Sequence, residues 1–171
     1  MKSNWLTVFI SHRPADKGIA DILKNVLQTW GSDNLCVYQS ADLRENCFDE
    51  GRCLTDAQKK ILTNTNVLFL IHTINDNDWY FCMYECGLAT SMNGNEVKIV
   101  VFQFSSSVPA SLEDQMRVSC DEKSIQNFVN NLHKDPTFFS KATEAFTPNI
   151  DKEILKFRST DLYKKLCRYG N

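Results

Sequence analysis

The 171-residue sequence contains no apolar run long enough to span a bilayer, and its first residues, MKSNWLTVF, lack the layout of a signal peptide. It also contains no internal repeat and no low-complexity tract. The formal net charge is only −2, so charge gives no reason to expect a nucleic-acid partner. We therefore expect a cytoplasmic globular protein of ordinary composition, with no nucleic-acid or membrane partner.

Patterns that bind metal ions are missing as well. The three histidines, His12, His72 and His133, are scattered, and none of the seven cysteines belongs to a CxxC motif. We therefore expect no metal site. Cys47 and Cys53 lie close together in a polar segment, but without a secretion signal we expect the thiols to be reduced.

Apolar runs alternate with amphipathic segments along the chain, which is typical of βαβ units. The fold class predicted is therefore α/β, with a parallel sheet of about five strands, helices on both faces, and a C-terminal helical extension. Residues 1–134 would form the main domain, and residues 135–171 would pack on it or lie next to it. The expected strands are 5–10, 35–38, 67–73, 97–104 and 116–120, and the expected helices are 15–30, 54–64, 78–92, 122–133 and 151–168.

The helix at 78–92 is the most informative stretch, because its centre holds one carboxylate, Glu85, among aromatic and thiol side chains. Such an acid either points to solvent, as most helix glutamates do, or is held in a semi-apolar pocket that tunes its ionisation. The apolar residues expected to make buried contacts along this helix are Phe81, Met83, Tyr84, Leu88 and Met92.

Ligands of open α/β sheets bind beyond the carboxyl ends of the strands. Three polar segments are expected to converge there: 11–13, 39–51 and 72–79. His12 is equally well explained as a turn residue or as a ligand contact. Arg13 either caps or is solvated, or it grips a phosphate or ribose through its fork of donors.

Several nucleotide-binding and hydrolytic motifs are absent. No GxGxxG follows the first strand and no GxxxxGK[ST] occurs, which disfavours Rossmann dinucleotide binding and P-loop chemistry. Ser11 has no His/Asp partner fixed by spacing, so a serine hydrolase is also disfavoured.

Five segments in this order resemble the TIR (Toll/interleukin-1 receptor) domain family over about residues 5–134. They are VFISHRPAD, LCVYQSADL, VLFLIHT, WYFCMYECGLA and KIVVFQF. The first carries the box (F/I)-(I/L)-S-(H/Y), and the fourth carries the more specific Trp-Cys-x-x-Glu box, which appears here as Phe81-Cys82-Met83-Tyr84-Glu85. The second leads into a polar loop, 39–51.

The resemblance implies a flavodoxin-like TIR fold and an enzyme that cleaves NAD⁺ at the nicotinamide–ribose bond, as a glycohydrolase or ADP-ribosyl cyclase. NAD⁺ would be the substrate, with no further cofactor. Glu85 would be catalytic, in a site shielded by Trp79, Phe81 and Tyr84. Substrate-binding residues would be Phe9, Ser11, His12 and Arg13, together with Trp79 or Phe81 as the aromatic facing the ligand.

Partners follow from the same resemblance. The 39–51 loop would mediate TIR–TIR self-association and gate the site. With no sensor or pore domain in the sequence, the enzyme would make a diffusible, cyclic ADP-ribose-type signal for a separate effector, similar to the TIR component of Thoeris anti-phage systems. Two alternatives stay open: a non-catalytic TIR adaptor or virulence-type interaction module, and a nucleoside deoxyribosyltransferase-like enzyme with a nucleophilic glutamate.

Overall fold

A computed structural model describes residues 5–41, 56–73, 79–92, 97–134, 145–146 and 150–169. Its centre is a five-stranded sheet in the order β2-β1-β3-β4-β5, and every neighbouring pair is parallel. This is the flavodoxin-like order for a doubly wound sheet, so the predicted fold class is confirmed. The strands are β1 (Leu6–Ser11), β2 (Leu35–Gln39), β3 (Val67–His72), β4 (Lys98–Gln103) and β5 (Met116–Ser119).

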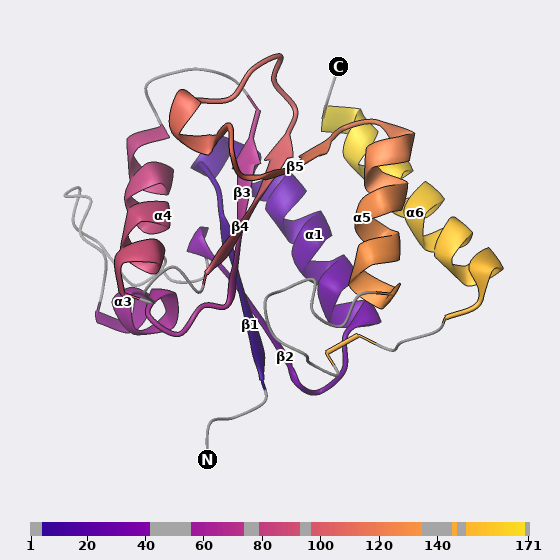
Figure 1. Ribbon diagram of the computed structural model, residues 1–171, viewed down its shortest axis with the longest axis horizontal. Coiled ribbons are helices and arrows are strands. Elements are labelled where there is room, and N and C mark those ends of the chain that lie inside the picture. The colour runs from indigo at the N-terminus through magenta and orange to yellow at the C-terminus, as the bar shows by residue number, and fades with distance from the viewer. Residues whose placement is uncertain are drawn as a thin grey trace.

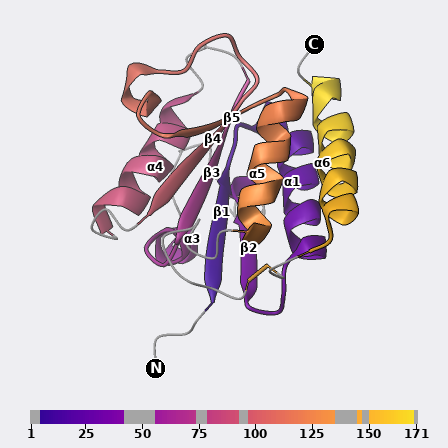
Figure 2. The same ribbon diagram turned by 45° about the vertical axis from the view of Figure 1, so that its right-hand side comes forward.

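Helices cover both faces of the sheet (Figures 1 and 2). On one face lie α1 (Lys17–Trp30) and α5 (Glu122–Lys134), and α6 (Lys152–Leu166) packs against these two helices on the same side. Two lie on the other: α3 (Asp56–Leu62) and α4 (Tyr80–Met92). Short 3₁₀ helices are η1 (Pro14–Asp16), η3 (Ala110–Leu112) and η4 (Cys167–Tyr169). All ten predicted elements are present among the described residues, and their ends differ from the prediction by at most two residues.

The strands read as unbroken apolar runs because both faces of the sheet are covered. All six residues of β3 are buried, and so are five of the six in β1. A polar residue ends each of these two strands, Ser11 in β1 and His72 in β3. The transition from apolar to polar side chains therefore falls at the carboxyl edge of the sheet.

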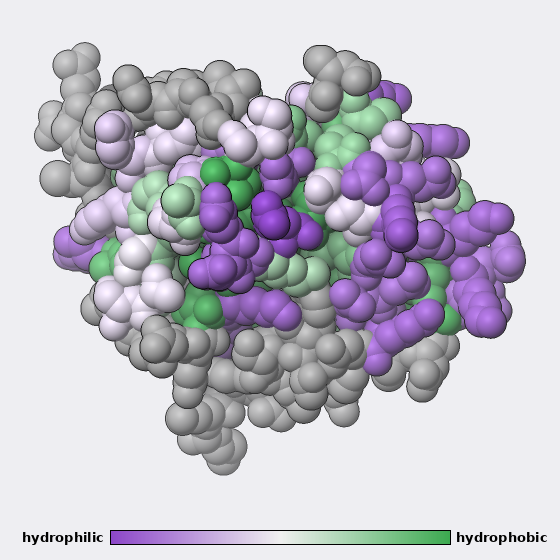
Figure 3. Space-filling view, turned by 45° about the horizontal axis from the view of Figure 1, so that its top comes forward, coloured by the Kyte–Doolittle hydropathy of each residue, from purple (hydrophilic) through white to green (hydrophobic). Residues whose placement is uncertain are grey.

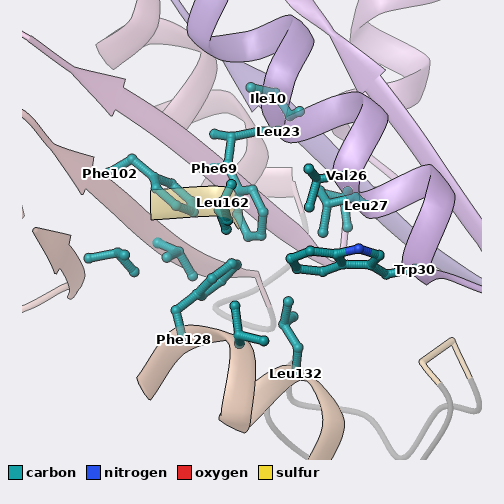
Figure 4. Close-up of a cluster of buried hydrophobic side chains, with 14 of the residues drawn as sticks. Ile10, Leu23, Val26, Leu27, Trp30, Phe69, Phe102, Phe128, Leu132 and Leu162 are labelled. Atoms are coloured by element: carbon teal, nitrogen blue, oxygen red, sulfur yellow. The ribbon is translucent and has the colours of Figure 1, made fainter. Parts of the chain in front are cut away.

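The larger apolar cluster lies between the sheet and α1, α5 and α6 (Figure 4). At its centre three phenylalanine rings meet: Phe102 lies 5.1 Å from Phe69 and 5.1 Å from Phe128 between ring centroids. The C-terminal helix takes part in this cluster through Leu155, Leu162 and Leu166. The predicted extension is thus packed on the main domain rather than held away from it.

The second apolar cluster lies under α4, and the predicted buried contacts of this helix are found only in part. Phe81, Met83 and Leu88 are half-buried and pack against the cluster, whereas the prediction for Tyr84 is wrong because its side chain is 54% exposed. The buried positions of the segment are Trp79, Cys82, Glu85, Cys86 and Ala89. Apolar side chains occur all round this helix, so their spacing does not select a face, and the small side chains allow close approach to the sheet. The side chain of Met92 lies outside the described residues.

None of the described helices combines the length and the apolar character needed to cross a membrane. The five described cysteines are free thiols, whereas Cys47 and Cys53 lie outside the described residues. Within the same part of the chain, no group of three or more His, Cys, Asp or Glu side chains is arranged to hold a metal ion.

Candidate functional site

Buried polar side chains gather at the carboxyl edge of the sheet, where β1, β2 and β3 end. Ser11 is the last residue of β1, Ser40 follows β2 directly, and Glu85 reaches this corner from α4. None of these three side chains has any exposed surface. A polar cluster of this kind is costly to bury unless its members bond to one another.

The Glu85 carboxylate accepts hydrogen bonds from both serines at the same oxygen. Ser11 Oγ donates to Glu85 Oε2 at 2.5 Å, and Ser40 Oγ donates to it at 3.0 Å. Bonds from hydroxyl donors to an ionised carboxylate are among the stronger hydrogen bonds in proteins, and they favour the charged form against the effect of burial. Glu85 is therefore a buried, oriented carboxylate, and the solvent-facing alternative is excluded.

Two thiols lie beside this carboxylate on α4, Cys82 and Cys86. Burial raises the pKa of the Cys86 thiol far above its usual value, and the negative charge of Glu85 and the neighbouring Cys82 add to the effect. Because the thiolate is the reactive form of cysteine, Cys86 is not a nucleophile at neutral pH. This leaves the Glu85 carboxylate as the candidate for chemistry at this corner.

Arg13 forms a second buried cluster close by. Its Nε donates to Asp16 Oδ2 at 2.7 Å and its Nη2 to Asp16 Oδ1 at 3.2 Å, which is the two-point geometry that a guanidinium offers a carboxylate. Nη2 also donates to Thr73 Oγ1, and that hydroxyl donates to Asp16 Oδ1 at 2.9 Å. Arg13 is 6% exposed, so its charge is compensated by Asp16 within the protein.

Trp79 joins the Arg13 cluster to β3. Its ring stacks on His72, with centroids 4.3 Å apart and planes at 25°, and the Arg13 guanidinium lies 5.1 Å from its centroid. His72 Nδ1 lies 2.6 Å from Ser105 Oγ, whose hydroxyl donates to Ser107 O, so His72 Nδ1 carries the proton. Trp79 is buried and in contact with side chains of the protein, whereas Phe81 is half-buried.

The remaining predicted residues lie around this core of the site. Phe9 is wholly buried in the apolar cluster beneath α4. His12 is buried, and its Nδ1 donates to the Arg13 carbonyl at 2.7 Å. Of the 39–51 loop, Gln39 belongs to β2 and Ser40 and Ala41 follow it in helical conformation, while 42–51 lie outside the described residues.

The structure therefore brings two of the predicted residues, Ser11 and Glu85, into direct contact and places Arg13 and Trp79 together in the neighbouring cluster. Sequence reasoning missed Ser40, Asp16 and Thr73. The i,i+3 spacing of Arg13 and Asp16 was a usable signal for that pair. Ser40 gave no signal of its own, because its role depends on a contact across 45 positions of the chain.

No family model matches the chain, and a search among curated proteins found no match. The fold and the site define its class: a flavodoxin-like α/β protein that holds a buried carboxylate at the carboxyl edge of its sheet. Membership of the TIR family stays a prediction from the sequence motifs.

Proposed function

We propose that this chain is an NAD⁺-cleaving enzyme of the TIR type, with Glu85 as the catalytic carboxylate. The observation that carries the proposal is the complete burial of Glu85, held by Ser11 and Ser40 at the carboxyl ends of the parallel strands. This is the edge at which open α/β proteins bind their ligands. A carboxylate fixed in a site of low polarity interacts with a developing positive charge more strongly than one in water.

One carboxylate is sufficient for this reaction. When the bond between the ribose C1′ and the nicotinamide nitrogen breaks, the electron pair goes to the nitrogen, and the cationic pyridinium leaves as neutral nicotinamide. No general acid is needed, unlike in most glycosidases, whose leaving oxygen requires a proton. Glu85 would stabilise the oxocarbenium-like ribose that remains.

The second half of the reaction consumes the ribosyl cation. Attack by water at C1′, with loss of one proton, gives ADP-ribose. Attack by an adenine nitrogen or a ribose hydroxyl of the same molecule gives a cyclic isomer instead. The two products differ by one molecule of water, so the site selects between them by admitting or excluding water.

The neighbouring groups have separate roles in this proposal. Ser11 fixes the carboxylate in one orientation. Arg13 would meet the pyrophosphate or ribose only if substrate binding drew its guanidinium away from Asp16 and Thr73, which compensate and orient it in this structure. The half-buried Phe81 is better placed than the buried Trp79 to present an aromatic surface to the substrate.

The burial of Glu85 also means that the substrate needs a way in. Because Glu85, Ser11 and Ser40 have no exposed surface, the substrate reaches the carboxylate only when covering side chains move. Turnover would therefore include an opening step, and such steps limit the rate of many enzymes. Self-association through the 39–51 segment, which the motifs predict, is a candidate trigger for this opening.

The experiment is incubation of the purified chain with NAD⁺ in ¹⁸O-labelled water, with the products separated by mass spectrometry. We expect nicotinamide together with either ¹⁸O-containing ADP-ribose or an unlabelled cyclic isomer. Glu85→Gln should abolish both products, and Glu113→Gln, at an exposed glutamate, should leave them unchanged. Deoxynucleoside turnover with NAD⁺ untouched would favour the deoxyribosyltransferase alternative.

The same complete burial favours a second function, a non-catalytic interaction module. In that case the bonds from Ser11 and Ser40 to Glu85 would serve only to tie α4 to β1 and β2. The discriminating result is unfolding of Glu85→Gln with no NAD⁺ cleavage by the wild-type chain under any condition that promotes its self-association.

A further inference from the structure

Ser40 occupies a junction that the proposed chemistry does not by itself explain. It is wholly buried, follows the last residue of β2, and begins the segment that leads into 42–55. Its hydroxyl lies 3.0 Å from Glu85 Oε2 and 3.4 Å from the Ile10 carbonyl, and the His12 backbone N–H donates to it at 3.4 Å. One hydroxyl thus touches β1, the β2 terminus and α4.

A hydroxyl has one proton to donate, so Ser40 bonds either Glu85 or Ile10 at any moment. The bond to Glu85 is shorter, and a charged acceptor makes it the stronger of the two. The N–H of His12 donates to the oxygen of the same hydroxyl, and a chain of donors polarises each member in the same direction. The arrangement therefore favours an ionised Glu85, and protonation of Glu85 would release the hydroxyl to Ile10.

We infer that Ser40 is a positioning residue for Glu85, which holds the ionised carboxylate in its working orientation and ties it to the end of β2. Only the expected effect of Ser40 on catalysis rests on the proposed function. The hydrogen bond itself can be tested without any turnover.

Loss of the Ser40 hydroxyl should affect the chemical step more than substrate binding. In Ser40→Ala we expect kcat to fall about tenfold, the effect of one hydrogen bond to a charged group, with KM within about twofold. The acidic limb of the pH–kcat profile should move to higher pH by about one unit, because the carboxylate loses a donor that favours its charged form. A merely structural serine would not move that limb.

Other groups near Glu85 also influence its titration, and the comparison between variants must hold them constant. Besides Glu85, the titratable and charged residues on α4 and on the elements packed against it are Asp56, Lys59, Lys60, His72, Tyr80, Cys82, Tyr84 and Cys86, and His12, Arg13 and Asp16 follow the end of β1. All of them are the same in the wild type and in Ser40→Ala. The difference in midpoint between the two proteins therefore belongs to Ser40.

Three further variants complete the design. Ser40→Thr keeps the hydroxyl and should restore both kcat and the position of the acidic limb. Ser40→Cys keeps the approximate size with a much weaker donor, so it should behave like Ser40→Ala even if the alanine variant folds poorly. Ser159→Ala removes a buried serine hydroxyl that bonds a carbonyl within α6, and it should match the wild type.

The direct test is a pH titration of the glutamate side-chain carboxyls by ¹³C NMR, with the Glu85 signal identified by its loss in Glu85→Gln. We expect its midpoint in Ser40→Ala and Ser40→Cys to lie about one pH unit above that of the wild type. Equal midpoints overturn the inference, whether or not the protein cleaves NAD⁺. A shifted midpoint in a protein that never cleaves NAD⁺ would retain the role of Ser40 and refute the proposed function instead.

Discussion

The two faces of the sheet are built differently. Between the sheet and α1, α5 and α6 lies the larger apolar cluster, centred on three phenylalanine rings. Beneath α4 the apolar cluster is smaller, and it borders the buried Glu85, Ser11 and Ser40 at the edge of the sheet. The first face supplies stability, whereas the second combines packing with a polar group that is costly to bury.

The helices on the two faces differ in the same way. Helices α1 and α5 have one apolar stripe and a polar outer side, and hydrophilic side chains crowd the surface over α5 and α6 (Figure 3). The 79–92 segment contains a single charged residue, Glu85, and places it on the buried side while Tyr80 and Tyr84 are exposed. A helix that buries its charge and exposes its aromatics departs from the pattern that stability alone would favour, and such departures are expected at functional sites.

The largest loss of stability should come from a change in the larger apolar cluster. Replacing Phe69 by alanine removes a wholly buried ring that contacts Phe102 and Phe128. We expect the free energy of unfolding to fall by about 3–5 kcal/mol, measured by urea denaturation. Phe157→Ala, at a ring that is 72% exposed, should change it by less than about 0.5 kcal/mol. Similar losses for the two variants would contradict the assignment of this face to stability.

The next effect should come from the Arg13 cluster. Asp16→Asn removes the charge that compensates the buried guanidinium, and the expected loss in the free energy of unfolding is about 3 kcal/mol. The matched control is Asp161→Asn, which breaks the exposed pair with Lys165 and should cost less than about 1 kcal/mol. If both variants lose the same stability, the buried cluster is not a structural support of the site.

The smallest expected effect is on the free energy of unfolding at alkaline pH. Burial, reinforced by the negative charge of Glu85, raises the pKa of Cys86 above its usual value of 9.0, so the folded protein keeps the thiol proton that the unfolded chain releases. Stability should therefore be intact below pH 9 and fall above it, by at most about 1.4 kcal/mol per pH unit from this group. Cys86→Ala should show a shallower decline between pH 9 and pH 10.5 in denaturation experiments, and parallel curves would refute the assignment.

The sequence predicted the sheet, its parallel direction and the helices, because apolar runs and stripes report directly on burial. It did not predict the inner face of α4, since apolar residues surround that helix and only the close fit of Cys82, Cys86 and Ala89 to the sheet selects it. The contact between Ser11 and Glu85 was anticipated only as convergence at one edge. The hydrogen bonds from Ser11 and Ser40 to Glu85 depend on distances between separate strands and α4, and no local sequence pattern reports those distances.

The central claim is that the buried carboxylate of Glu85 acts on NAD⁺. The most direct measurement is the initial rate of nicotinamide release at saturating NAD⁺ by the wild type, Glu85→Gln and Glu113→Gln, all verified as folded. We predict release by the wild type and by Glu113→Gln at the same rate, and a rate at least about 100-fold lower for Glu85→Gln. Equal rates for the wild type and Glu85→Gln, including no release by either, would contradict the claim.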